Sequence, residues 1–191
     1  MNDEFVYKNL DNTATIFPAI SNGRNTNVFR LHVTLKEEID ENILNLAAEY
    51  TMEMLPLFKV RLRTGLFWWY FEPNNQKIYC EKEKDYPNRA IFKKNKNNYL
   101  LRITYYGNRI NLEMFHALAD GAGAIIFMKT LLSNYLQISH PERRNELLYS
   151  PDISEKQMWE DSYITNSDAI NPKNKNSNKK PLITIRKILL L

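Results

Sequence analysis

The chain has 191 residues and a mass of 22.6 kDa, a length typical of one domain or of one domain with a tail. Apolar residues make up 43 % and charged residues 25 %, so the composition excludes a wholly disordered chain. The formal net charge is +4, and the single cysteine, Cys80, favours a reducing compartment. The polar N-terminal segment lacks a signal-peptide pattern, and no run approaches about 18 apolar residues. We therefore expect a cytoplasmic protein with no membrane span.

The first regular elements predicted along the chain are a strand and a helix. Apolar and polar residues alternate over residues 28–35, which predicts a strand with Arg30 on its polar face. A helix is predicted to begin at residues 37–40, where acidic residues favour the positive end of its dipole, and to end before Pro56. Apolar residues at three- and four-residue spacing form its predicted buried stripe: Ile39, Ile43, Leu46, Ala47, Tyr50 and Met54.

Short strands follow this helix. Residues 58–62 and 66–71 are predicted to form a hairpin around the turn at 63–65. The aromatic run 67–71 indicates sheet core rather than a binding pocket. Another short strand is expected at residues 78–80.

A second hairpin and a second helix complete the predicted body. Strands at 99–106 and 109–115 flank a turn at Gly107-Asn108, and a helix is predicted over 121–136. The order of strand, helix, hairpins and helix predicts the α+β class, with a mixed, largely antiparallel sheet and two main packed helices.

One short segment carries the residue types of a reaction centre. His116 ends an apolar strand, and Asp120 and Gly121 stand where the next helix begins. A histidine held between two rigid elements is suited to act as a general base, while Asp120 can cap the helix. The alternative is a hydrogen-bonded structural histidine followed by an ordinary N-cap, and the spacing H-x-x-x-D-G does not by itself decide between the two.

The flanking segments give this motif a context. The chain resembles bacterial alcohol-acetyltransferase-like proteins of the chloramphenicol-acetyltransferase-like superfamily, which includes coenzyme A-dependent acyltransferases and condensation domains. The resemblance covers about residues 7–165, although many members have a second histidine where this chain has Phe115. The segments that carry the resemblance, in order, are Tyr7–Asn12, Val28–Leu31, Val60–Leu62, Gly65–Glu72, Asp85–Pro87 and Phe115–Gly121.

The resemblance implies an acyl-transfer reaction. His116 would be the base that deprotonates a small alcohol or amine acceptor, and a coenzyme A thioester would be the cosubstrate, with no tightly bound cofactor and no metal. Asp120 would be a structural acid paired with an arginine, for which Arg30 is the candidate, and Gly121 would allow the turn. The cofactor-binding residues are not predicted.

Length separates this chain from that family, whose members have more than 400 residues and place the site between two halves. We expect residues 1–165 to form the N-terminal lobe and residues 166–191 to form a low-complexity basic tail. The lobe would need a companion C-terminal half or a homo-oligomer. The alternative is a non-catalytic lobe or truncated remnant that acts as a protein-interaction module.

The remaining candidate features predict no other chemistry. His32 and His140 have no metal-ligand spacing to an acid or to Cys80, so we expect structural or solvent-facing roles. The sequence contains neither a phosphate-binding glycine-rich loop nor the motif G-x-S-x-G. The tail from residue 171 carries six of the 26 basic residues and no acid, which leaves residues 1–170 with a net charge of −2. We therefore expect no nucleic-acid binding by the body.

Overall fold

The computed structural model describes residues 8–9, 16–21, 25–66, 69–91, 97–146, 148–149 and 151. The predicted tail and the aromatic residues Phe67 and Trp68 lie outside the described residues. The elements are β1 (Lys8–Asn9), α1 (Ile16–Ile20), β2 (Val28–Thr34), α2 (Glu41–Met54), η1 (Pro56–Phe58), β3 (Val60–Thr64), β4 (Trp69–Pro73), β5 (Cys80–Lys82), β6 (Leu101–Tyr106), β7 (Arg109–Phe115), α3 (Gly121–Ser139) and η2 (Pro141–Glu146).

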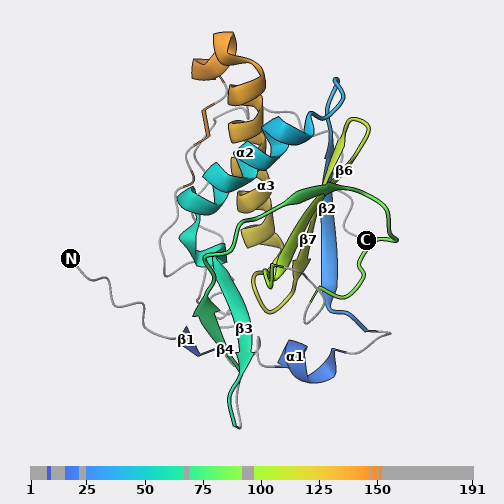
Figure 1. The fold of residues 1–191 in the computed structure, drawn as a ribbon, viewed down its shortest axis with the longest axis vertical. Helices are drawn as coiled ribbons and strands as arrows, with labels where there is room; N and C mark the ends of the chain where they lie inside the picture. Colours follow the sequence, from blue (N-terminus) through green and yellow to red (C-terminus); the bar gives the residue numbers. More distant parts are fainter. Residues whose placement is uncertain are drawn as a thin grey trace, which may run out of the picture.

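The strands in the described ranges form two sheets. The larger has the order β2-β7-β6-β5, with antiparallel pairs β2–β7 and β6–β7 and a parallel pair β5–β6. The smaller has the order β1-β4-β3 and is antiparallel. The predicted α+β class, with a mixed and largely antiparallel sheet, is confirmed, although its strands divide between two sheets. Figure 1 shows α2 and α3 together on one side of the larger sheet, with the smaller sheet below α2.

The register of the larger sheet explains why the helices cover one face. Leu31 pairs with Leu112, and Leu112 pairs with Ile103, so these side chains point to the same face. All three are almost completely buried. Phe58 of η1 and Phe127 of α3 pack edge to face with ring centroids 5.0 Å apart. All of these residues belong to one hydrophobic core.

Helix α2 begins later than predicted, because Asp40 lies outside it as the N-cap. The Asp40 carboxylate accepts hydrogen bonds from the backbone N–H groups of Asn42 and Ile43, at 2.8 and 3.1 Å. These two N–H groups have no acceptor within the helix, so the cap fixes its first turn.

The predicted buried stripe of α2 is partly wrong. Leu46, Tyr50 and Met54 are exposed by 40 to 47 %. Ile39 and Ala47 are buried as predicted, and the buried face of the helix also carries Leu44, Ala48, Thr51 and Met52. Helix α2 packs on α3 through this face, where the Asn134 amide of α3 donates to the Thr51 hydroxyl at 3.0 Å.

The β6–β7 hairpin has the predicted turn. Gly107 has φ of 55°, a conformation that glycine adopts without steric cost. It stands at the first central position of the two-residue turn between Tyr106 and Arg109, where type II′ hairpins require positive φ. None of the helices in the described part of the chain is long and apolar enough to cross a membrane.

Candidate functional site

The turn between β7 and α3 holds the motif histidine. His116 directly follows β7, and its backbone N–H donates to the Asn27 carbonyl at 2.8 Å. The Leu118 N–H then donates back to the Phe115 carbonyl at 2.8 Å, which closes the turn. The base candidate therefore lies at the end of a buried strand, with its backbone held from both sides.

Asp120 ends this turn as the N-cap of α3. Its carboxylate accepts a hydrogen bond from the Gly123 N–H at 2.9 Å, one of the unpaired donors of the first helical turn. The predicted capping role of Asp120 is thus observed in the structure.

Gly121 does not carry the steric requirement that we predicted. A Cβ at Gly121 would meet no atom within 4 Å, and its φ is not positive. The close approach lies two residues later, because a Cβ at Gly123 would be 2.9 Å from the Ala119 Cβ.

Aromatic rings pack against the imidazole of His116. Phe17 of α1 stacks on it with ring centroids 4.9 Å apart and an interplanar angle of 15°. Phe29 of β2 contacts it at 4.7 Å, tilted by 49°. These contacts restrict rotation of the ring and shield part of it from water, so that His116 is half-buried.

This packing sets the protonation state of His116. Burial lowers its pKa below the ordinary value of 6.5, while a hydrogen bond to its own backbone and the charge of Asp120 act in the opposite direction. The nitrogen that can reach the residue's own carbonyl is Nδ1, so a proton held there leaves Nε2 as an acceptor. Burial therefore favours the neutral form of the ring, which can accept a proton.

Arg30 is not the partner that we predicted for Asp120. Its guanidinium binds Glu113, with Nε and Nη2 at 2.9 and 2.6 Å from Oε1, and Glu83, with Nη1 at 2.5 Å. Arg30 and Glu113 are cross-strand partners of β2 and β7, so their side chains share a face of the sheet. That face lies opposite the helices.

Glu113 is the centre of an ion cluster that we did not predict. Besides Arg30, it accepts from Arg102 of β6 and from the Asn88 N–H at 2.7 Å. Burial alone would raise the pKa of Glu83, but Arg30 and Arg109 together hold that pKa below its ordinary value. The cluster attaches the segment that follows β5 to the sheet. The sequence feature that could have indicated this cluster is an acidic residue, Glu113, within the apolar strand predicted over residues 109–115.

The comparisons with known proteins support the fold. Polyketide synthase associated protein 5 from Mycobacterium tuberculosis is similar over 69 % of this chain and 33 % of its own, with a TM-score of 0.51 and 19 % identity. A point mutant of the starter condensation domain of rhizomide synthetase RzmA is similar over 68 % of this chain and 36 % of its own, with a TM-score of 0.53 and 7 % identity. No family model matches the chain, and no curated protein matches it in sequence.

A third similar structure contains a ligand. The same RzmA mutant in complex with C8-CoA has a TM-score of 0.51 and 7 % identity, over 61 % of this chain and 31 % of its own. The fold is therefore condensation-domain-like. This chain spans about a third of the length of each of these proteins, which corresponds to one lobe.

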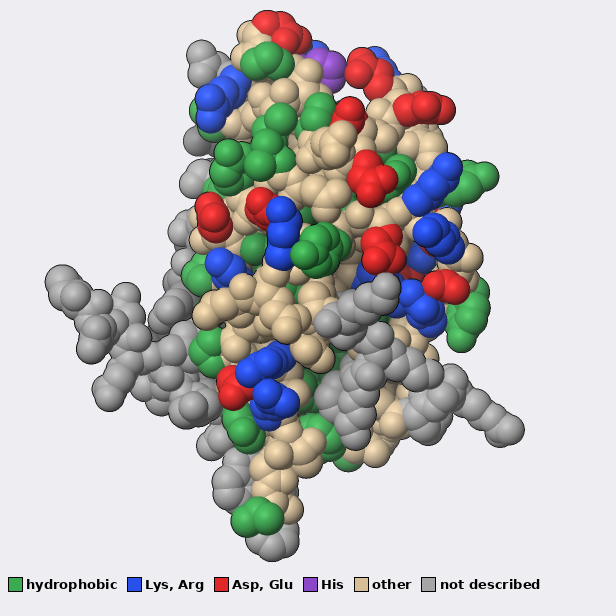
Figure 2. Space-filling model, viewed as in Figure 1, with side chains coloured by type: hydrophobic (Ala, Val, Ile, Leu, Met, Phe, Trp, Pro, Cys, Tyr) green, Lys and Arg blue, Asp and Glu red, His purple; other side chains and the backbone are tan. Residues whose placement is uncertain are grey.

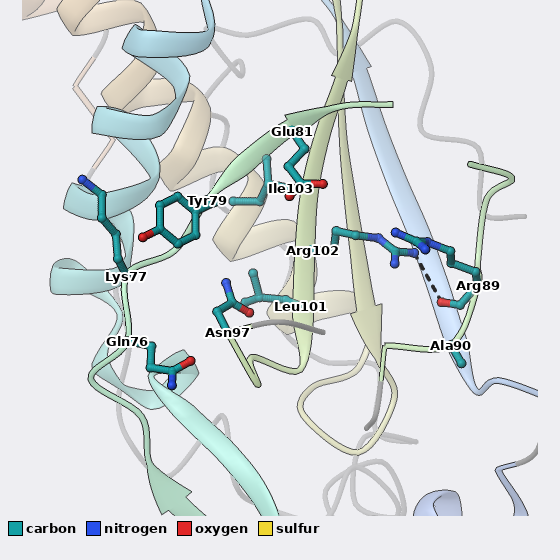
Figure 3. A pocket seen from close by; sticks show the side chains of 10 residues that line it. All are labelled: Gln76, Lys77, Tyr79, Glu81, Arg89, Ala90, Asn97, Leu101, Arg102 and Ile103. Carbon is teal, nitrogen blue, oxygen red and sulfur yellow. Dashed lines mark hydrogen bonds between the residues drawn. The ribbon is translucent and has the colours of Figure 1, made fainter. Parts of the chain in front are cut away.

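A cavity of about 450 Å³ lies away from His116, beside β5 and β6 (Figure 3). Its three cationic side chains already have carboxylate partners: Lys77 with Glu49, Arg89 with Asp85, and Arg102 with Glu113. Arg102 also donates to the Arg89 carbonyl at 3.3 Å. Because these charges are already paired, the cavity is poorly suited to hold an anion.

The other candidate residues lie outside the site. His140 is close to Glu37 and Glu142, at 3.7 and 3.6 Å, beyond the end of α3. Cys80 is buried in β5, and burial raises the pKa of its thiol, so it remains protonated. Among the described residues, no group of three acids, histidines or cysteines could hold a metal ion. In the described part of the face shown in Figure 2, acidic and basic side chains are interspersed.

Proposed function

We propose that this chain is the histidine-bearing lobe of a coenzyme A-dependent O-acyltransferase that transfers an acetyl group from acetyl-CoA to a small alcohol. His116 is its general base, and Asp120 shapes the loop that presents it. The observation that carries the proposal is the position of His116, directly after β7 and packed against Phe17 and Phe29, in a condensation-domain-like fold.

The reaction needs one proton acceptor on this lobe. Nε2 of His116 takes the proton of the acceptor hydroxyl as its oxygen attacks the thioester carbonyl carbon. The tetrahedral intermediate collapses with cleavage of the C–S bond, and the imidazolium returns the proton to the departing thiolate. The products are an ester and free coenzyme A. An amine acceptor follows the same steps to an amide.

The surroundings of His116 suit this role. A lowered pKa keeps the base unprotonated at neutral pH, and the contacts with Phe17 and Phe29 hold the ring in one orientation. The C8-CoA complex of a structurally similar condensation domain supports a coenzyme A thioester as the donor.

The proposal places the rest of the site on a second polypeptide segment. Because this chain spans about a third of its structural neighbours, a companion half or a second copy would supply a wall of the active site, most coenzyme A contacts and the donors that stabilise the oxyanion. We further propose that residues 1–165 form the catalytic lobe and residues 166–191 a separate tail.

Release of coenzyme A thiol tests the reaction. The chain is assayed with acetyl-CoA and a panel of primary alcohols, alone and together with any polypeptide encoded directly downstream of it. We expect transfer by the wild type, loss of transfer in His116→Ala, and retention in His140→Ala, a matched histidine control outside the site. A rate in His116→Ala equal to that of the wild type would exclude His116 as the base.

The second candidate is a non-catalytic lobe that binds a partner protein, and the small share of each neighbouring structure that this chain spans favours it. This candidate predicts no turnover in either preparation, together with retention of a companion polypeptide by the folded chain in a pull-down.

A further inference from the structure

Asn27 has a backbone conformation that most residues avoid. It lies directly before β2 with φ of 50°, in the left-handed region that asparagine tolerates better than other non-glycine residues. Its carbonyl and its side chain bind two different segments, the end of β7 and helix α1.

The backbone of Asn27 holds the motif histidine. Its carbonyl accepts the hydrogen bond from the His116 N–H at 2.8 Å, one residue beyond the last β2–β7 pair. The two residues are 89 positions apart in the sequence, so this bond joins the start of β2 to the end of β7.

The side chain of Asn27 holds α1. Its Nδ2 donates to the Phe17 carbonyl at 3.1 Å and to the Ser21 hydroxyl at 2.7 Å. The Ser21 hydroxyl in turn donates to the same Phe17 carbonyl at 2.6 Å. The backbone of Phe17 is thus fixed by both Asn27 and Ser21.

These two sets of hydrogen bonds meet at the imidazole ring, because Phe17 is the residue that stacks on His116. We propose that Asn27 is a positioning residue, which holds Phe17 against one face of the His116 ring and thereby sets the orientation of the base. The effect of Asn27 on catalysis depends on the proposed acyl transfer being correct. The effect of Asn27 on the orientation of the His116 ring does not depend on it.

A purely structural role for Asn27 is the competing explanation, since its amide also satisfies carbonyl and hydroxyl groups at the end of a short helix. The two explanations differ in what they predict for the ring. If the Asn27 amide only stabilises the end of the helix, its removal lowers the stability of the protein and leaves the surroundings of His116 unchanged. Loss of a positioning contact also changes the surroundings of His116 in the folded protein.

The test uses Asn27→Gly, because glycine keeps the positive φ and removes only the amide. Ser21→Ala removes the second arm of the same network, and Phe17→Ala defines the full effect of losing the stacked ring. Asn98→Gly is the matched control, since Asn98 also has a positive φ, of 57°.

The measurement is the NMR titration of the histidine ring protons in the full chain, which has three histidines. In Asn27→Gly and Ser21→Ala we expect the His116 signals to move downfield toward their position in Phe17→Ala, and its pKa to rise toward 6.5. The aromatic groups that contact the ring come from α1 and β2, and the charge that acts on it is Asp120 at the start of α3. Every variant retains Asp120.

The outcomes separate the two proposals. If folded Asn27→Gly and Ser21→Ala keep the wild-type ring shifts and pKa, while Phe17→Ala changes them, Asn27 does not position the base. If acyl transfer is present, Asn27→Gly should lower kcat/KM by about 10- to 100-fold, because a misplaced reacting group is costly, and Asn98→Gly should not. If no transfer occurs in any form, the acyltransferase proposal fails and the ring shifts still decide the role of Asn27.

Discussion

Replacement of Glu113 by glutamine should cause a large loss of stability. The Glu113 side chain is almost completely buried and accepts five hydrogen bonds, from Arg30, Arg102 and the Asn88 N–H. Glutamine retains one acceptor oxygen and places an NH₂ group against guanidinium donors. The change leaves buried positive charge without its partner, which typically costs about 3–5 kcal/mol.

The structure favours the lower end of this range. Arg30 keeps its ion pair with Glu83 at 2.5 Å, and the Arg102 side chain is 14 % exposed, so water can partly replace its lost carboxylate. We expect a loss of about 3 kcal/mol in the free energy of unfolding, which corresponds to a decrease of roughly 6–12 °C in Tm for a domain of this size.

Urea denaturation followed by circular dichroism measures this loss. The control is Glu72→Gln, since Glu72 also binds two arginines, Arg61 and Arg63, but near the surface. Ion pairs that water can reach contribute little, so Glu72→Gln should change the midpoint only slightly. A loss in Glu113→Gln no greater than in Glu72→Gln would show that the buried cluster does not stabilise the fold.

Three further predictions concern the site and the core. Gly123→Ala should lower the free energy of unfolding by about 1–3 kcal/mol, because its Cβ would clash with the Ala119 Cβ. Gly121→Ala should raise the free energy of unfolding by about 0.4–1 kcal/mol, because a Cβ there meets no atom. Melting temperatures of the two variants equal to that of the wild type would contradict both predictions. The Cys80 thiol should react with a thiol reagent in denaturant and not in buffer, because burial raises its pKa and blocks access; rapid native labelling would contradict this. Folding lowers the pKa of His116, so the unfolded chain binds a proton at this residue more tightly than the folded chain does. The contribution of His116 to the free energy of unfolding should therefore be complete above pH 6.5 and decrease as the pH falls below it. His116→Phe should lack this component of the urea-midpoint pH profile, and an identical profile would contradict the assignment.

Local sequence patterns were sufficient to predict the elements whose structure depends only on neighbouring residues. The alternation of apolar and polar residues over 28–35 predicted β2, and glycine at position 107 predicted the turn of the β6–β7 hairpin, because side-chain alternation and positive φ are properties of a few neighbouring residues. The acid at position 120 was predicted as a helix cap for the same reason.

The same reasoning failed where two segments must meet. Periodicity assigned Leu46, Tyr50 and Met54 to the core, but the buried face of α2 carries Leu44, Ala48, Thr51 and Met52. Arg30 was assigned to Asp120, but the register of β2 against β7 places it opposite Glu113. Neither the register nor the helix contact is encoded in local spacing.

What the sequence by itself determined is the α+β class, the strands and helices that flank His116, and the location of His116 at a strand end, whereas β1 and α1 were not predicted. Tertiary structure alone decided that Phe17 stacks on this histidine, that Asn27 joins both, and that a charged cluster lies within the protein. The physical reason is range: helix, strand and turn preferences act over a few residues, whereas burial and ion pairing depend on residues far apart in the chain that folding brings together.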